Sequence, residues 1–131
     1  MRVIGIGTHS GSQVDNIILA IAEVERLSGQ QCDTLASLAR GDCDASIYKA
    51  AQATGHKVLF FSHAELSRRA ADCVTQSDAS MSAHSIPSVA EAAALAGAGL
   101  SSRLEMPRRT CSGVTIAVAV SVEMAGKETQ R

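Results

Sequence analysis

The sequence predicts an α/β fold, a three-layer α/β/α sandwich with a mixed sheet of about five strands and a C-terminal β-hairpin. Short aliphatic runs alternate with segments of helical periodicity, which is the pattern of strands and helices in α/β domains. Apolar residues make up 46% of the chain and aromatic residues only 2%, so the core is built from aliphatic side chains and alanine. Such small side chains favour helices packed closely on a sheet.

The length of 131 residues suits one domain. We expect this domain over residues 1–125 and a flexible tail over 126–131. The net charge of −1 and the few aromatic residues argue against nucleic acid as a partner. The longest apolar run, residues 114–120, is too short to cross a bilayer, and no signal-type segment precedes the first polar loop. We therefore expect a soluble cytoplasmic protein that does not bind membranes.

A strand is expected over residues 2–6, where β-branched residues are followed by glycines. An amphipathic helix follows from Ser12 and ends at Gly29, a residue type typical of helix C-termini. Either Ser10 or Ser12 is its expected N-cap. The apolar positions with helical spacing are Val14, Ile17, Ile18, Ile21 and Val24.

The next segments continue the alternation. A short strand is expected over residues 34–39, and a helix over 45–54 with Asp44 as N-cap and Gly55 after its end. The continuous apolar run at 58–61 fits a strand that is buried on both faces.

A capping box formed by Ser62 and Glu65 predicts a helix that runs to about residue 72. Residues 74–86 are rich in Ser, Thr, Asp and Gln and show no hydrophobic period, so a loop is expected there.

A second capping box, Ser88 with Glu91, predicts a helix over residues 86–95 with Pro87 in its first turn. Ser88 and Glu91 could in principle take part in catalysis, and Ser88, at the start of this helix, is also a candidate ligand-binding residue. The capping box already explains both residues, so the structural interpretation is preferred.

The last two strands are expected at residues 104–106 and 114–122, joined by a basic turn at 107–113. In the final strand large residues alternate with small ones: Val114, Ile116, Val118, Val120 and Val122 on one face, and Thr115, Ala117, Ala119 and Ser121 on the other. A helix can lie close to the small face, so we expect helices on both faces of the sheet.

The loop after the first strand is a candidate ligand site. Glycines at 5, 7 and 11 let the backbone approach a bound group, and hydroxyl groups stand next to a helix N-terminus, which can hold an anion. The loop lacks the Walker lysine and the third Rossmann glycine, which argues against a nucleotide. A tight turn with nothing bound is the alternative. The candidate ligand residues here are Gly7, Thr8, His9, Ser10, Gly11 and Ser12.

The predicted hairpin carries a second group of candidates. Arg108 and Arg109 are suited to pair with a carboxylate or phosphate, together with Ser112 and Gly113, although a solvated turn explains them equally well. Arg68 and Arg69 are expected on an exposed helix face.

Acid–base chemistry has two weak candidates, His9 in the glycine loop and Glu91. The four cysteines form no C-x-x-C pair, and the four histidines lack the i, i+4 spacing of a helical metal site. We therefore expect free, mostly buried thiols, no metal site and no cofactor.

Four stretches of the chain carry motifs of one known family. The most specific is P-S-V-A-E-A-A-A-L at residues 87–95. The others are V-I-G-I-G at 3–7 with Gly11 and Ser12, L-F-F-S-H-A-E-L at 59–66 and S-G-V-T-I-A-V-A at 112–119. Together they resemble the CobE/CbiG C-terminal domain family of cobalamin (vitamin B12) biosynthesis, and the resemblance covers essentially the whole chain.

The resemblance implies work on corrin-ring intermediates, large rings edged with carboxylates. It implies first a protein that binds such a tetrapyrrole intermediate as a carrier or assistant in the aerobic pathway. Two-domain members of the family are cobalt-precorrin-5A hydrolases, so an enzyme acting on the ring is an alternative. A module that docks onto other cobalamin-biosynthesis enzymes is a third hypothesis. In the hairpin, Arg108 stands where the family tends to carry lysine.

Overall fold

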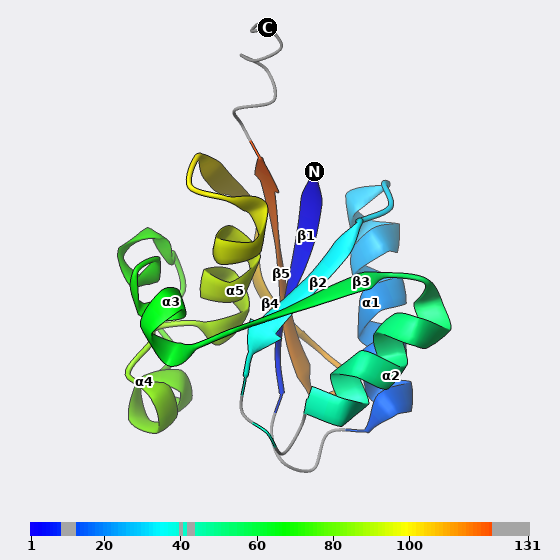
Figure 1. The fold of residues 1–131 in the computed structure, drawn as a ribbon, viewed down its shortest axis with the longest axis horizontal. Coiled ribbons are helices and arrows are strands. Elements are labelled where there is room, and N and C mark those ends of the chain that lie inside the picture. The colour runs from blue at the N-terminus through cyan, green and yellow to red at the C-terminus, as the bar shows by residue number, and fades with distance from the viewer. Residues whose placement is uncertain (9–12, 40, 42–43, 122–131) are drawn as a thin grey trace, which may run out of the picture.

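The computed structural model describes residues 1–8, 13–39, 41 and 44–121 of the chain. Its sheet lies between two layers of helices, α1 and α2 on one face and α3, α4 and α5 on the other (Figure 1). The strands are β1 (Arg2–Gly7), β2 (Thr34–Leu38), β3 (Lys57–Phe61), β4 (Ser102–Cys111) and β5 (Val114–Ser121). The helices are α1 (Val14–Ser28), α2 (Asp44–Thr54), α3 (His63–Ser67), the 3-10 turn η1 (Ala70–Asp72), α4 (Asp78–His84) and α5 (Val89–Ala98).

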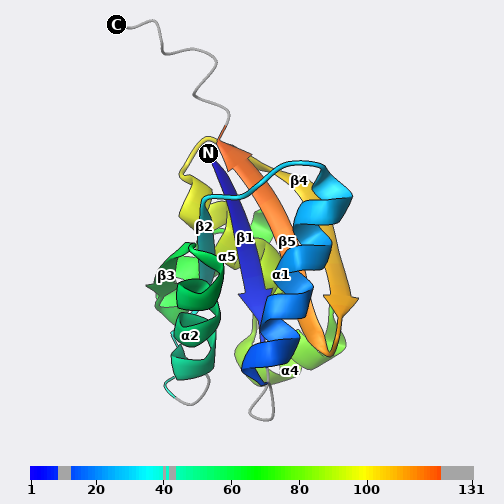
Figure 2. The ribbon, with the colours of Figure 1, turned by 90° about the vertical axis from the view of Figure 1, so that its right-hand side faces the viewer.

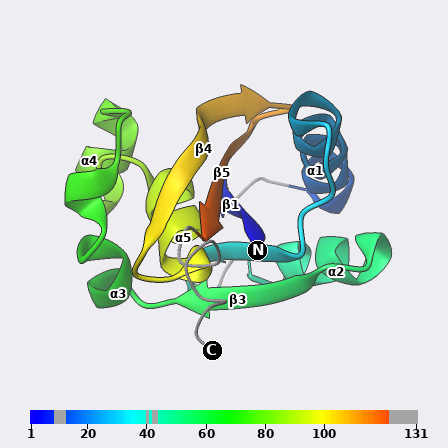
Figure 3. The same cartoon turned by 90° about the horizontal axis from the view of Figure 1, so that it is seen from above.

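The sheet is mixed and has the strand order β3-β2-β1-β5-β4. Strands β1, β2 and β3 are parallel, β5 is antiparallel to β1, and β4 forms a hairpin with β5. Figure 3 shows the two helical layers on either side of this sheet. The predicted three-layer fold with about five strands and a C-terminal hairpin is confirmed.

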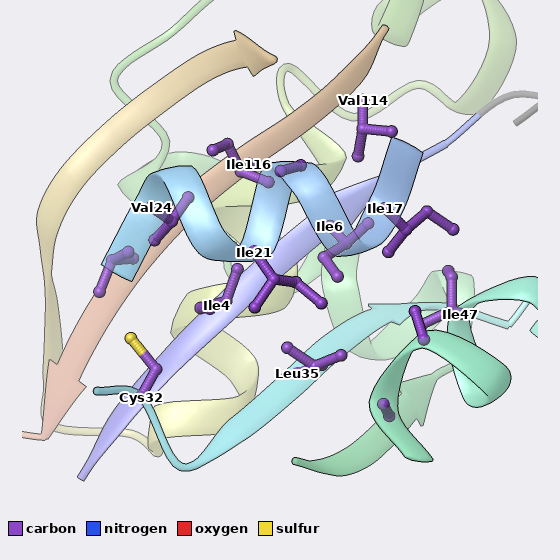
Figure 4. Packing of buried hydrophobic residues seen from close by; sticks show 14 residues of the cluster. Ile4, Ile6, Ile17, Ile21, Val24, Cys32, Leu35, Ile47, Val114 and Ile116 are labelled. Atoms are coloured by element: carbon purple, nitrogen blue, oxygen red, sulfur yellow. The ribbon is translucent and has the colours of Figure 1, made fainter. Parts of the chain in front are cut away.

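Helix α1 covers one face of the sheet with the predicted apolar stripe. Ile17, Ile21 and Val24 are buried against Ile4 and Ile6 of β1 (Figure 4). Full burial of side chains of this size contributes about 1.5–3 kcal/mol each. The same cluster includes Leu35, Ile47, Val114, Ile116 and Val118.

The ends of α1 agree with the prediction at one terminus only. Gly29 is the C-cap, with a φ of 73° in the left-handed region, as expected. The helix begins at Val14, so Gln13 is the N-cap and makes no side-chain capping bond. The prediction that Ser10 or Ser12 caps this helix is wrong.

Small residues let α5 lie close to the other face of the sheet. A Cβ atom on Gly5 would sit 1.8 Å from the carbonyl oxygen of Ala90, and one on Gly97 would sit 2.8 Å from Cγ1 of Val3. Ala117, which pairs with Gly5 across the sheet, is also buried. Gly5 is therefore required by the packing of α5 on β1 and not by a bound group. The small face predicted for the last strand is confirmed.

Strand β3 differs from its prediction. It is an edge strand, paired only with β2, and none of its residues is fully buried. Leu59, at its centre, is 41% exposed. The apolar run at 58–61 was expected to be covered on both faces, but Val58 and Phe60 pack only partly buried against the core beneath α1 and α2, and Leu59, on the other face, is exposed.

Two further predictions are wrong between residues 62 and 86. The capping box of Ser62 and Glu65 is present with both hydrogen bonds, but the helix that it opens ends at Ser67. The polar segment expected to be a loop contains α4, capped by Ser77, whose side chain accepts a hydrogen bond from the N–H of Ser80. Short polar helices of this kind depend on caps and show no apolar period.

The hairpin strand β4 is longer than predicted, because it continues through residues 107–111 to a two-residue turn. Two register shifts interrupt its pairing with β5. From Met106 to Arg109 the strand advances three residues while its partner advances two, from Val118 to Ile116. One extra residue therefore bulges from β4 at this point.

Candidate ligand site at the carboxyl edge of the sheet

The candidate residues converge on one edge of the sheet. Strand β1 ends here at Gly7, and the hairpin turn between β4 and β5 lies at the same end (Figure 2). The hydroxyl group of Thr115 donates a hydrogen bond to the carbonyl oxygen of Gly7 over 3.0 Å. A Cβ atom on Gly7 would lie 2.3 Å from this hydroxyl oxygen and 3.8 Å from the backbone nitrogen of Ala90. Gly7, β5 and the first turn of α5 are thus direct neighbours.

The chain changes direction across the sheet at this edge. The connection after β1 leads to α1 on one face and then to β2. The strand on the other side of β1 is β5, which is antiparallel to β1 and is reached from α5, on the opposite face, through β4. In open α/β sheets, ligands bind at such switch points, outside the carboxyl ends of the strands.

Ser88 is the N-cap of α5, and its hydroxyl oxygen accepts a hydrogen bond from the N–H of Glu91 over 3.2 Å. Ser88 is only 1% exposed. The predicted capping box is half correct, because the Glu91 carboxylate does not return to the N-cap. Pro87 lies before the cap and outside the helix, contrary to the prediction that it starts the helix.

The Glu91 carboxylate is completely buried and accepts four hydrogen bonds. One oxygen accepts from the backbone N–H groups of Val74 over 2.8 Å and Thr75 over 3.0 Å. The other accepts from the Thr75 hydroxyl over 2.7 Å and from the N–H of Arg108 over 2.8 Å. Burial raises the pKa of Glu91, but the bonds from Arg108, Thr75 and Val74 together lower it below the usual Glu value. The carboxylate is held ionised.

Of the three arginines of β4, Arg108 and Arg109 lie next to the hairpin turn, and their surroundings differ. Arg109 is paired with Ile116, which belongs to the core beneath α1, and its charge helps to lower the pKa of Glu23 on that helix, after the larger effect of Arg26. Pro107 and Arg108 lie in the bulge, and the backbone N–H of Arg108 donates to the Glu91 carboxylate of α5.

Ser112 and Gly113 form the whole turn of the hairpin. Both have positive φ angles, 53° and 78°. This is the conformation of a type I′ turn, which matches the twist of the flanking strands. The two residues therefore shape the tip of the hairpin beside the candidate edge.

The structure brings together Gly7, Ser88, Glu91 and Arg108, with Ser112 and Gly113 at the same end of the sheet. Thr8, half-buried, directly follows β1. Residues 9–12, which include the candidates His9, Ser10, Gly11 and Ser12, lie outside the described residues. Ligand contacts and acid–base roles for all these residues remain predictions.

Two residues important to this region were not predicted from the sequence. Thr75, in the polar segment assigned to a loop, supplies two of the four bonds to Glu91. Arg69, expected on an exposed face, donates to the carbonyl oxygens of Leu95 and Gly99 and caps the C-terminus of α5. Both contacts span more than fifteen residues of sequence, so no local pattern signals them.

The cysteine thiols that the structure describes are free: Cys32 is buried, and Cys73 and Cys111 are half-buried. Burial raises the pKa of Cys32 to about 12 and that of Cys73 to about 11. Within the described residues, no group of three or more His, Cys, Asp or Glu side chains could hold a metal ion. In this same part of the chain, no helix combines the length and apolar character needed to span a membrane.

The fold and this edge define the class of the protein, a single-sheet α/β/α sandwich whose switch point lies at the end of β1. The chain belongs to the family described as "Cobalamin synthesis G C-terminus", whose sequence model matches residues 2–119. It is therefore a member of a cobalamin-biosynthesis family, as the resemblance predicted.

Two solved structures are similar to the chain. CobE, a protein from the cobalamin (vitamin B12) biosynthetic pathway, is 25% identical, with a TM-score of 0.84 over 91% of this chain and 89% of that chain. Cobalamin biosynthesis protein chiG from Agrobacterium tumefaciens str. C58 is 35% identical, with a TM-score of 0.77 over 93% of this chain and 99% of that chain. No curated protein has a significantly matching sequence.

Proposed function

We propose that this protein binds a corrin-ring intermediate of cobalamin biosynthesis at the carboxyl edge of its sheet and acts as a carrier or assistant between enzymes. The observation that carries the proposal is the convergence of Gly7, the start of α5 and the bulged strand at Arg108 at the switch point of the sheet. Membership of a cobalamin-biosynthesis family supports the choice of ligand.

The charges at this edge suit a ring edged with carboxylates. Arg108 and Arg109 lie on the strand that borders the edge, and guanidinium groups pair well with carboxylates. The Glu91 carboxylate is buried and saturated with donors, so it does not face the ligand as a free negative charge. Because all four hydrogen bonds to the Glu91 carboxylate come from the protein itself, nothing supports Glu91 as an acid–base catalyst. Binding of the ring is therefore better supported than catalysis as the function of the protein.

A spectroscopic titration tests the proposal. Hydrogenobyrinic acid and its precursors absorb visible light, and we expect a saturable change in the absorption spectrum when the protein is added. Arg108→Ala is expected to weaken binding about tenfold, through loss of a charged hydrogen-bond donor. Arg103→Ala is the matched control: it removes the same charge from the same strand, but Arg103 pairs with Val120 at the opposite end of the sheet. We expect its affinity within about twofold of the wild type.

An unchanged spectrum with all these compounds would contradict the proposal. Mass analysis of each compound after incubation separates carriage from catalysis, because a carrier returns its ligand with the mass unchanged. A changed mass would favour the hydrolase-like alternative.

A further inference from the structure

We propose that Glu91 is a positioning residue that anchors the bulge of β4, and thereby the placement of Arg108 at the candidate edge. The inference rests on the proposed function for its ligand, but its structural part stands on contacts within the protein.

The bulge determines how Arg108 lies on the strand. From the turn, the register runs without interruption to Arg109, which the turn therefore places opposite Ile116, on the α1 side. Because side chains alternate along a strand, an extra residue moves every side chain beyond it to the opposite face. Loss of the bulge would therefore change the pairing of Arg108 and of the residues before it, and would leave Arg109 in place.

Glu91 provides the hydrogen-bond partner of the backbone N–H of Arg108 in the bulge. The N–H of Arg108 donates to the Glu91 carboxylate over 2.8 Å. Leaving this part-buried N–H group without a partner would cost up to about 1–3 kcal/mol, so the carboxylate stabilises the strand in its bulged conformation. Glu91 itself is held in place by α5 and by the N–H groups of Val74 and Thr75.

The substitution Glu91→Gln tests this bond selectively. All four groups around the carboxylate donate, and an amide offers only one accepting oxygen. If the glutamine oxygen faces the N–H groups of Val74 and Thr75, the two backbone bonds to it are kept. The glutamine NH2 group then faces the N–H of Arg108, which loses its acceptor. Thr75→Val is the matched control, because it removes a bond to the same carboxylate oxygen and leaves the Arg108 bond intact.

Hydrogen exchange gives a readout that needs no ligand. In Glu91→Gln we expect the Arg108 amide to exchange at least about tenfold faster than in the wild type, and in Thr75→Val to stay within about threefold. In the corrinoid titration, Glu91→Gln is expected to weaken binding about tenfold and Thr75→Val to change it less than about threefold.

The outcomes distinguish this inference from the proposed function. If the wild type does not bind the ring, the proposed function fails, and Arg108 exchange alone decides the role of Glu91. Unchanged Arg108 exchange in Glu91→Gln, or equal effects of the two variants, would overturn the inference. If Glu91→Gln does not fold, a pH titration of the wild-type amide resonances decides. If the amide resonances of Val74, Thr75 and Arg108 shift with one common pH midpoint, the inference is supported. If the Arg108 resonance does not share that midpoint, the inference is overturned.

Discussion

Gly5 is a residue at which close packing leaves no room for a side chain. Its missing side chain leaves room for the backbone of α5, and the nearest atoms to an added Cβ belong to the backbone of that helix. From the sequence, Gly5 looked like part of a flexible ligand loop. The sequence could not distinguish a glycine that faces a ligand from one that faces a helix, because both roles require the same absence of a Cβ atom.

Gly5→Ala is expected to destabilise the protein by about 3 kcal/mol or more, because the backbone of α5 cannot move aside like a flexible side chain. Gly29→Ala is the contrast. The added Cβ atom would meet no atom within 4 Å, so the cost is only the strain of a left-handed backbone conformation, about 1–2 kcal/mol. Urea unfolding measures both values, and equal losses would show that α5 is not closely packed on β1.

The ionised state of Glu91 makes stability depend on pH. The folded pKa is below the usual value, so the stabilisation is present above the unfolded pKa and is lost as pH falls through the folded pKa. We expect the free energy of unfolding to fall more steeply between about pH 6 and pH 3 in the wild type than in Glu91→Gln. Parallel curves for the two proteins would contradict this assignment.

Helix α5 is the element that organises the candidate edge, since it covers β1, receives the Ser88 cap and carries Glu91. Its existence and N-cap were predictable from local sequence, because an N-cap and a run of alanines act within a few residues. Its other end was not predictable, because the donor is Arg69, which lies on a different element.

Arg69→Ala is expected to destabilise the protein by about 2 kcal/mol, because it leaves the last carbonyl groups of α5 without their charged donor. Arg68→Ala is the neighbouring control, since Arg68 is exposed, and its effect should stay within about 0.5 kcal/mol. Thermal and urea unfolding give the comparison. A similar small effect of both substitutions would show that the cap does not contribute to stability.

The hairpin of β4 and β5 can be stabilised at its turn. Ser112 adopts a positive φ of 53°, which asparagine tolerates better than serine. We expect Ser112→Asn to raise the free energy of unfolding by about 0.5 kcal/mol and Gly113→Ala to lower it by about 1 kcal/mol. Urea unfolding tests both signs, and a destabilising Ser112→Asn would show that the serine makes a favourable contact in the turn.

The whole molecule was more predictable than its site. The alternation of strands and helices and the large and small faces of β5 determine the layers, since each pattern follows directly from which faces are covered. Edge position is decided by strand order, which no local pattern contains, so the exposure of Leu59 on β3 was missed. The site depends on contacts such as that of Glu91 with Thr75 and Arg108, between segments distant in sequence.

Cysteine labelling follows the unfolding of the whole domain. Cys32 is buried in the core beneath α1, and burial raises its pKa to about 12. We expect a thiol reagent to modify Cys32 at least about a hundredfold more slowly in the native protein than in urea, because the core must open first. Mass analysis of the peptides that contain Cys32 gives the rate. Equal rates in both conditions would contradict the packing around α1.

The two ends of the described fold are neighbours on the side of the molecule opposite the candidate edge. The N–H of Ser121, the last residue of β5, donates to the carbonyl oxygen of Met1 over 3.1 Å. Strand β1 then separates Met1 from Gly7 by its full length (Figure 2). Immobilisation on a sensor chip through the amino terminus would therefore turn the candidate edge towards the solution, where even a bulky ring could reach it unobstructed by the support.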